Sequence, residues 1–137
     1  MMKLVITTPF AVAIEENDVA ALQAEDGTGR FGIQPDHADL LAALVPSVIS
    51  WQRGDGVMRY CAVHGGILTM ADGNAISVSS RDAVPGDDLE TLETEVVARF
   101  TRRRSEEETA RIATERMILA ALRQIIAFIR PDRAPRP

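Results

Sequence analysis

Short apolar stretches separated by turn residues fill the first part of the chain. The dipeptides Asp26-Gly27, Asp55-Gly56 and Asp72-Gly73 favour tight turns, because glycine adopts positive φ without a Cβ clash. Many short strands separated by such turns predict an all-β sandwich or barrel. The stretches with strand character are residues 4–8, 10–14, 19–24, 48–52, 57–63, 67–70 and 75–78.

The hydrophobic period becomes helical after Pro85-Gly86. Asp87 and Glu90 have the spacing of a capping box at a helix start. A single apolar stripe follows, made of Leu89, Leu92, Val96 and Phe100. This pattern predicts a first amphipathic helix that begins close to residue 87.

A second helix is predicted after the three arginines at 102–104, which suit a helix C-terminus. Ser105 and Glu108 repeat the capping-box spacing, and Pro131 marks the end of the helical pattern. The two stripes predict an antiparallel two-helix hairpin, followed by a frayed tail over residues 132–137. The second stripe consists of Ile112, Leu119, Leu122, Ile126 and Ile129.

Charge divides the chain at the same point. The 137 residues carry a net charge of −5, and residues 1–84 account for all of it with ten acids and five bases. Residues 85–137 hold ten acids and ten arginines. We therefore predict a strand domain over residues 1–84 and a helical domain over residues 85–137. The acidic excess argues against nucleic acid as a partner.

The remaining composition indicates a soluble intracellular protein. The sequence contains no apolar stretch of about 20 residues, the length that crosses a membrane, so we expect no membrane insertion. The single cysteine, Cys61, fits a reducing compartment and is expected to be a small buried side chain.

Two glycine motifs leave an enzyme open as an alternative. Residues 27–32 match the G-x-G-x-x-G pattern of dinucleotide sites, but Pro35 follows where that pattern needs a helix. His64-Gly65-Gly66 is similar to an esterase oxyanion loop, although no G-x-S-x-G nucleophile motif exists in the chain. The simpler interpretations are a strand connection for residues 27–32, and a β-bulge or a close backbone approach for the paired glycines at 65–66. The alternative function is a small nucleotide-binding or hydrolytic enzyme that uses both loops.

Other polar positions have a structural and a binding interpretation. His37 lies between Asp36 and Asp39 without metal-ligand spacing, so it is either an exposed loop residue or part of a contact surface. Three arginines along the predicted second helix form either a solvated face or a surface for an acidic partner: Arg111, Arg116 and Arg123.

The order of motifs resembles one family. Residues 29–41 read G-R-F-G-I-Q-P-D-H-A-D-L-L and resemble the G-x-F-G-I-x-P-x-H-A-x-L-L segment of the epsilon subunit of F-type ATP synthases. Residues 65–68, G-G-I-L, are similar to the strand entry of that family, and residues 3–9 are similar to its opening strand. The resemblance covers residues 3–85 well, and the helical part matches in architecture more than in sequence.

The resemblance implies a flattened N-terminal β-sandwich, a C-terminal helical hairpin, no catalytic residues and no cofactor. Such a subunit belongs to the rotating central stalk on the cytoplasmic face of the bacterial inner membrane. Its partners are the gamma subunit and the polar loops of the c-subunit ring, with Arg30, Phe31 and His37 at the ring-facing end. Extended helices also meet the catalytic beta and alpha subunits and restrain ATP hydrolysis, for which Arg111, Arg116 and Arg123 are the candidates.

Three positions depart from the family pattern. Residues 89–94 correspond to an ATP-binding motif of some bacterial members, but Glu93 replaces the arginine that would meet phosphate. We therefore expect no ATP sensing there. Arg30 occupies a position that is often acidic, and His64 stands where a small residue is common.

Overall fold

A computed structural model describes residues 1–129, which form a strand region followed by helix. The chain divides into two compact units, Met1–Thr101 and Arg102–Pro137. The strands are β1 (Met2–Thr7), β2 (Val12–Asp26), β3 (Gly29–Ile33), β4 (Leu40–Arg53), β5 (Met58–Ala71), β6 (Ala75–Ser79) and β7 (Ala83–Gly86). The helical elements are α1 (Leu89–Thr91), η1 (Leu92–Val97) and α2 (Ala98–Ile129).

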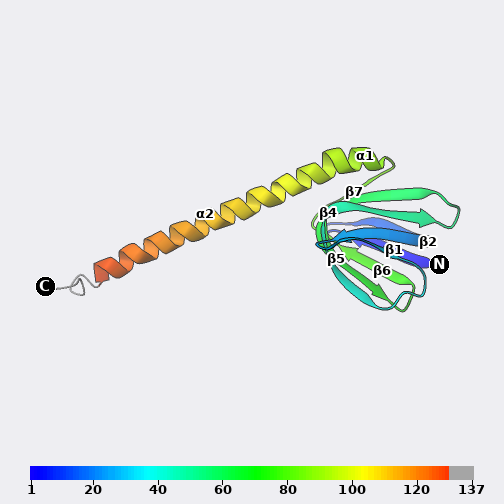
Figure 1. Cartoon of the computed structure of the whole chain (residues 1–137), viewed down its shortest axis with the longest axis horizontal. Helices are drawn as coiled ribbons and strands as arrows, with labels where there is room; N and C mark the ends of the chain where they lie inside the picture. The colour runs from blue at the N-terminus through cyan, green and yellow to red at the C-terminus, as the bar shows by residue number, and fades with distance from the viewer. Residues whose placement is uncertain (130–137) are drawn as a thin grey trace. The chain divides into compact units, whose positions relative to one another are not determined.

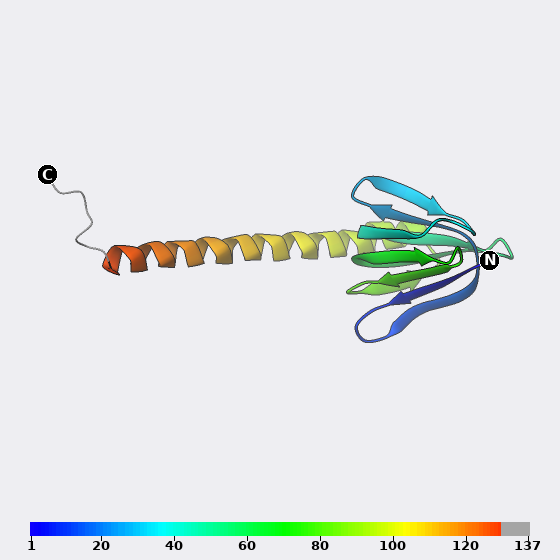
Figure 2. The same cartoon turned by 90° about the horizontal axis from the view of Figure 1, so that it is seen from below.

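The strands form two layers that share their three longest members (Figure 1). In one layer β1 pairs with β6 and with the first part of β2, and β6 pairs with the second half of β5. In the other layer β7 pairs with the first half of β5, and the far part of β2 lies between β4 and β3. Figure 2 shows the long strand β2, in blue, curving round the edge of the strands. The predicted β-sandwich is thus confirmed.

Strand β5 changes layers at Gly65-Gly66. Both glycines have positive φ, +70° and +125°, which residues with a Cβ rarely adopt. A Cβ on Gly65 would lie 2.9 Å from the Leu44 carbonyl oxygen, and one on Gly66 would overlap the Ser79 carbonyl oxygen. The glycine pair therefore permits a close backbone approach, as the simpler interpretation of this motif predicts.

The main core lies between the layers and explains the alternation of the sequence. Trp51, Cys61 and Leu68 belong to it and are almost completely buried. Residues at the alternate positions of β4 and β5, such as Val48 and Ala62, face outward and form a second apolar cluster with the helix that follows β7. The outer face of the β7–β5–β4 layer is therefore covered by helix rather than by solvent.

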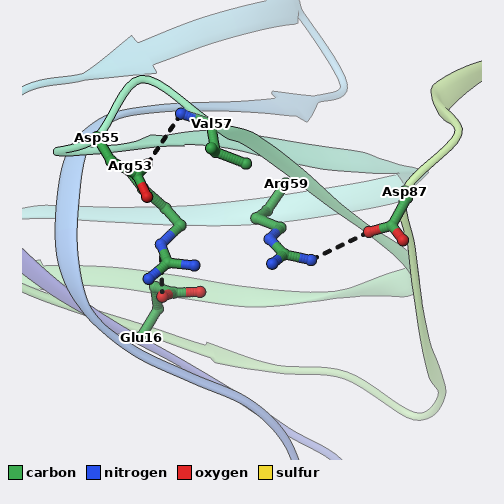
Figure 3. Close-up of polar contacts among 6 residues, drawn as sticks. All are labelled: Glu16, Arg53, Asp55, Val57, Arg59 and Asp87. Atoms are coloured by element: carbon green, nitrogen blue, oxygen red, sulfur yellow. Dashed lines mark hydrogen bonds and ion pairs between the residues drawn. The ribbon is translucent and has the colours of Figure 1, made fainter.

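That helical segment starts one residue later than the capping pattern predicts. The side chain of Asp88, not Asp87, accepts a hydrogen bond from the Glu90 amide at 3.1 Å, and Thr91 Oγ1 donates to Asp88 at 2.7 Å. These bonds hold the pKa of Asp88 below its ordinary value. Asp87 instead pairs with Arg59 on β5, at 3.1 Å from its Nη1 (Figure 3).

The π-helical stretch η1 aligns the first apolar stripe. In an α-helix a step of four residues overshoots a full turn by about 40°, so Leu92 and Phe100 would diverge by about 80°. The wider turn of a π-helix opposes this drift. Leu92, Val96 and Phe100 all lie buried against Val48 and Ala62.

The predicted two-helix hairpin is not what the structure shows. Residues 98–129 form one uninterrupted helix, α2, through Arg102–Ser105, where the break was expected. All described residues from 101 to 129 are exposed, including the second stripe that was expected to pack on the first. No glycine or proline lies between residues 87 and 130, so no residue forces a turn. The predicted tail over residues 132–137 lies outside the described residues.

We expect Gly66→Ala to destabilise the strand unit by about 2 kcal/mol or more, because the new Cβ meets the Ser79 carbonyl and φ stays positive. The matched control is Gly27→Ala, whose Cβ would have no neighbour within 4 Å. Urea unfolding of both variants measures the difference. Equal stability of the two variants would contradict the close-approach role of Gly66.

We expect the Cys61 thiol to resist alkylation in the native protein at pH 8. Burial raises the pKa of this thiol from 9.0 to about 12, so little thiolate forms. The stability linked to this shift is complete below pH 9.0 and declines as the pH rises toward about 12. Iodoacetamide labelling followed by mass spectrometry checks the prediction. Rapid stoichiometric labelling before unfolding would overturn it.

Candidate functional site

A hollow of about 260 Å³ opens beside β3 and the first residues of β4. Two of the three predicted ring-contact residues, Phe31 and His37, line it together. We call it the β3–β4 hollow, and its full lining is Asp26, Phe31, Gly32, His37, Leu40, Leu41 and Ala42.

The β2–β3 turn supplies the only carboxylate of this lining. Asp26 accepts hydrogen bonds from the amide and the hydroxyl of Thr28, at 2.8 Å and 2.6 Å. The hydroxyl bond contributes most to holding the pKa of Asp26 below its ordinary value. The hollow therefore carries a negative charge at neutral pH.

The loop that carries His37 is tied to the β5–β6 turn. The Asp36 amide donates to the Gly73 carbonyl at 2.7 Å, and the Asp72 amide donates to the Asp39 carboxylate at 3.2 Å. His37 Nδ1 lies 2.7 Å from the Ala38 carbonyl oxygen. Because a carbonyl only accepts, Nδ1 is the donor here, which leaves Nε2 for a partner.

Arg30, the third predicted contact residue, lies apart from this pair. Neighbouring side chains of a strand point to opposite faces, and Phe31 packs toward the core. The guanidinium of Arg30 instead reaches Glu93 of η1, with Nη1 3.7 Å from Oε1. The structure therefore brings Phe31 and His37 together and directs Arg30 toward η1, on the opposite face of β3.

Sequence reasoning did not identify two contributors to the hollow. Leu41 is 72% exposed although its neighbour Ala42 is buried, and Asp26 comes from a different turn. The alternation along residues 40–44 could have identified Leu41. Ala42 and Leu44 occupy the inward positions of the strand, so Leu41 must face outward although it is apolar. Asp26 carries no such signal, since only the fold brings it near His37.

The three candidate regulatory arginines lie on the exposed part of α2. Successive residues of an α-helix are about 100° apart, so Arg116 and Arg123 lie within about 20° of one another. Arg111 is about 140° away from Arg116 on the same measure. Arg116 and Arg123 therefore share one face of the helix, and Arg111 belongs to another.

Neither glycine motif takes the form that the enzyme alternative requires. Residues 27–32 form the β2–β3 turn and most of β3, and no helix follows them. His64 lies inside β5 and stacks on Phe100, with ring centroids 5.0 Å apart. Within residues 1–129 no group of three or more His, Cys, Asp or Glu side chains is arranged to hold a metal ion.

Residues 1–129 contain no helix that is both long and apolar enough to cross a membrane.

Two solved structures share the fold. A chain of the Euglena gracilis mitochondrial ATP synthase, solved as OSCP/F1/c-ring, matches with a TM-score of 0.60 at 22% identity, over 88% of this chain and 81% of that one. A chain of the Tetrahymena thermophila mitochondrial ATP synthase central stalk and c-ring matches with a TM-score of 0.55 at 15% identity, over 83% and 94%.

Sequence comparison gives closer relationships. The ATP synthase epsilon chain 2 of Paraburkholderia xenovorans (strain LB400) is 35% identical over 96% of this chain and 95% of its own length. The protein of the same name from Cereibacter sphaeroides is also 35% identical, over 98% and 90%. The family model of the ATP synthase delta/epsilon chain β-sandwich domain matches residues 1–86. The chain therefore belongs to the delta/epsilon chain family of ATP synthases.

Proposed function

We propose that this chain is a non-catalytic rotor subunit of a membrane ATP synthase. In this role it joins the gamma subunit to the polar loops of the c-subunit ring, peripherally on the cytoplasmic face of the bacterial inner membrane. Nearly full-length similarity to epsilon chains at 35% identity supports the assignment. Residues 1–84 would carry the rotor contacts, and residues 85–137 would carry regulation.

The observation that carries the ring contact is the β3–β4 hollow. A coupling part must transmit torque without yielding, and the hydrogen bonds of Asp36 and Asp39 to the β5–β6 turn hold the His37 loop in place. Exposed Leu41 beside Phe31 offers an apolar surface whose burial against a partner would favour binding. The Asp26 carboxylate favours a cationic side chain on the ring loop.

The continuous helix and the predicted hairpin are proposed as two states of one regulatory element. The apolar stripe of α2 is exposed in the continuous state, and folding back at residues 102–105 would bury part of it against residues 89–100 and the strands beside them. In the continuous state, the face that carries Arg116 and Arg123 is available to acidic segments of the catalytic beta and alpha subunits. Restraint of ATP hydrolysis would follow from that contact, in which Arg111 takes part from a second face.

We expect Leu41→Asp to uncouple the enzyme without unfolding this chain. The side chain is mostly exposed, so its loss leaves the core intact, whereas a charge in a docked apolar contact weakens binding by about tenfold or more. The measurement is ATP-driven ion uptake per ATP hydrolysed in inverted membrane vesicles. Val57→Asp, at an exposed position of the β4–β5 turn, is the matched control. Unchanged uptake in Leu41→Asp, and in Phe31→Ala and His37→Ala, would remove the ring-contact assignment.

We expect the simultaneous substitution of Arg111, Arg116 and Arg123 by glutamate, which reverses their charge, to raise the ATP hydrolysis rate of the assembled enzyme. Repulsion from acidic partner segments would replace attraction. The matched control reverses three other exposed arginines of the same helix, at positions 102–104. Hydrolysis rates of the purified complexes decide the outcome. Equal rates in both variants would count against a regulatory role for these three side chains.

A further inference from the structure

The helical region changes character at a single residue. Leu92, Val96 and Phe100 are buried against the outer strand face, whereas every described residue from 101 to 129 is exposed. The boundary between the two compact units falls at the same place, between Thr101 and Arg102. Phe100 is therefore the last side chain that the strand unit covers, although the helix itself continues.

Three kinds of contact hold residues 89–100, which we call the docked segment, to the strands: apolar packing, ring stacking and ion pairing. Its apolar side chains pack on Val48, Ala62 and their neighbours. The ring of Phe100 lies nearly parallel to that of His64, with an interplanar angle of 12°. Glu93 is ion-paired with Arg30 on β3, and Asp87, just before the docked segment, is ion-paired with Arg59 on β5 (Figure 3).

The backbone of β7 and β5 accommodates the docked segment at Gly86 and at His64. A Cβ on Gly86 would lie 3.1–3.2 Å from the side-chain carbons of Leu92, so the β7 end leaves space that a larger residue would fill. The amide of His64 donates to Ser80 Oγ at 3.1 Å and to the Asp82 carbonyl at 3.1 Å, which fixes this part of β5. His64 thus presents its ring to Phe100 from a held position.

We propose that the docked segment is a permanent part of the strand unit, fixed at its end by the stacking of Phe100 on His64, and that rearrangement of the helical region is confined to residues beyond Thr101. The outer face of the β7–β5–β4 layer is then closed to other subunits in every state. All three candidate regulatory arginines lie in the part that moves. Only the effect on hydrolysis rests on the proposed function, since the docking concerns this chain alone.

Hydrogen exchange of the isolated full-length chain tests the docking. We expect the amides of residues 93–100 to exchange as slowly as those of β4 and β5, and His64→Ala and Phe100→Ala each to accelerate them at least about tenfold. Phe128→Ala, which removes an exposed phenylalanine of α2, is the matched control and should leave them unchanged. Exchange of residues 93–100 far faster than β4 and β5 in the unmodified chain overturns the proposal. An unaltered rate in both His64→Ala and Phe100→Ala overturns the role of the stack.

A covalent bridge between β3 and η1 tests whether rearrangement is confined to residues beyond Thr101. Arg30→Cys with Glu93→Cys introduces two half-exposed thiols that a short bismaleimide joins, while buried Cys61 stays unreactive. Bridged and unbridged samples of this variant, in the assembled enzyme, should hydrolyse ATP at equal rates. A hydrolysis rate that changes severalfold on bridging overturns the proposal. Truncation after Thr101 distinguishes a failure of the docking proposal from a failure of the proposed regulation. An unchanged hydrolysis rate in the truncated variant contradicts only the proposed regulation.

Discussion

The close approach of β5 to its neighbours at Gly65-Gly66 is the constraint on which the rest of the structure depends. It allows one strand to serve both layers. The half before the bend provides Ala62 and His64 for the docked segment. The half after it leads into the β5–β6 turn, whose Asp72 and Gly73 hold the loop of His37. The candidate ring contact and the docked segment therefore both contact β5 or the turn that follows it.

The ion pairs give the departures from the family pattern a structural explanation. Arg30 and Glu93 each stand where the resemblance leads one to expect a different charge, and in this structure they meet each other. An exposed pair of this kind contributes little stability, about 0–1 kcal/mol. His64, which stands where the resemblance leads one to expect a small residue, stacks on Phe100. These substitutions all lie where the docked segment meets the strands.

Local patterns predicted strand positions better than strand lengths. Asn17-Asp18 and Gly65-Gly66 each lie between two stretches that were predicted as separate strands, yet β2 and β5 run through them. Pairing with two different neighbours keeps each half of these strands extended. The hairpin prediction relied on Ser105 and Glu108, whose capping spacing is equally compatible with a helix interior. For the candidate site, the resemblance of residues 29–41 to the family motif predicted Phe31 and His37. The position of Arg30 followed only from the pleat, and that of Asp26 only from the tertiary fold.

Rotor membership is the central claim, and co-purification measures it most directly. A tagged copy of the full chain is expressed in the organism from which the chain comes and extracted in mild detergent. It should co-purify with both the gamma subunit and the c-subunit ring. Leu41→Asp should retain gamma and lose much of the ring. Recovery of the tagged chain with neither gamma nor c subunits would contradict the account.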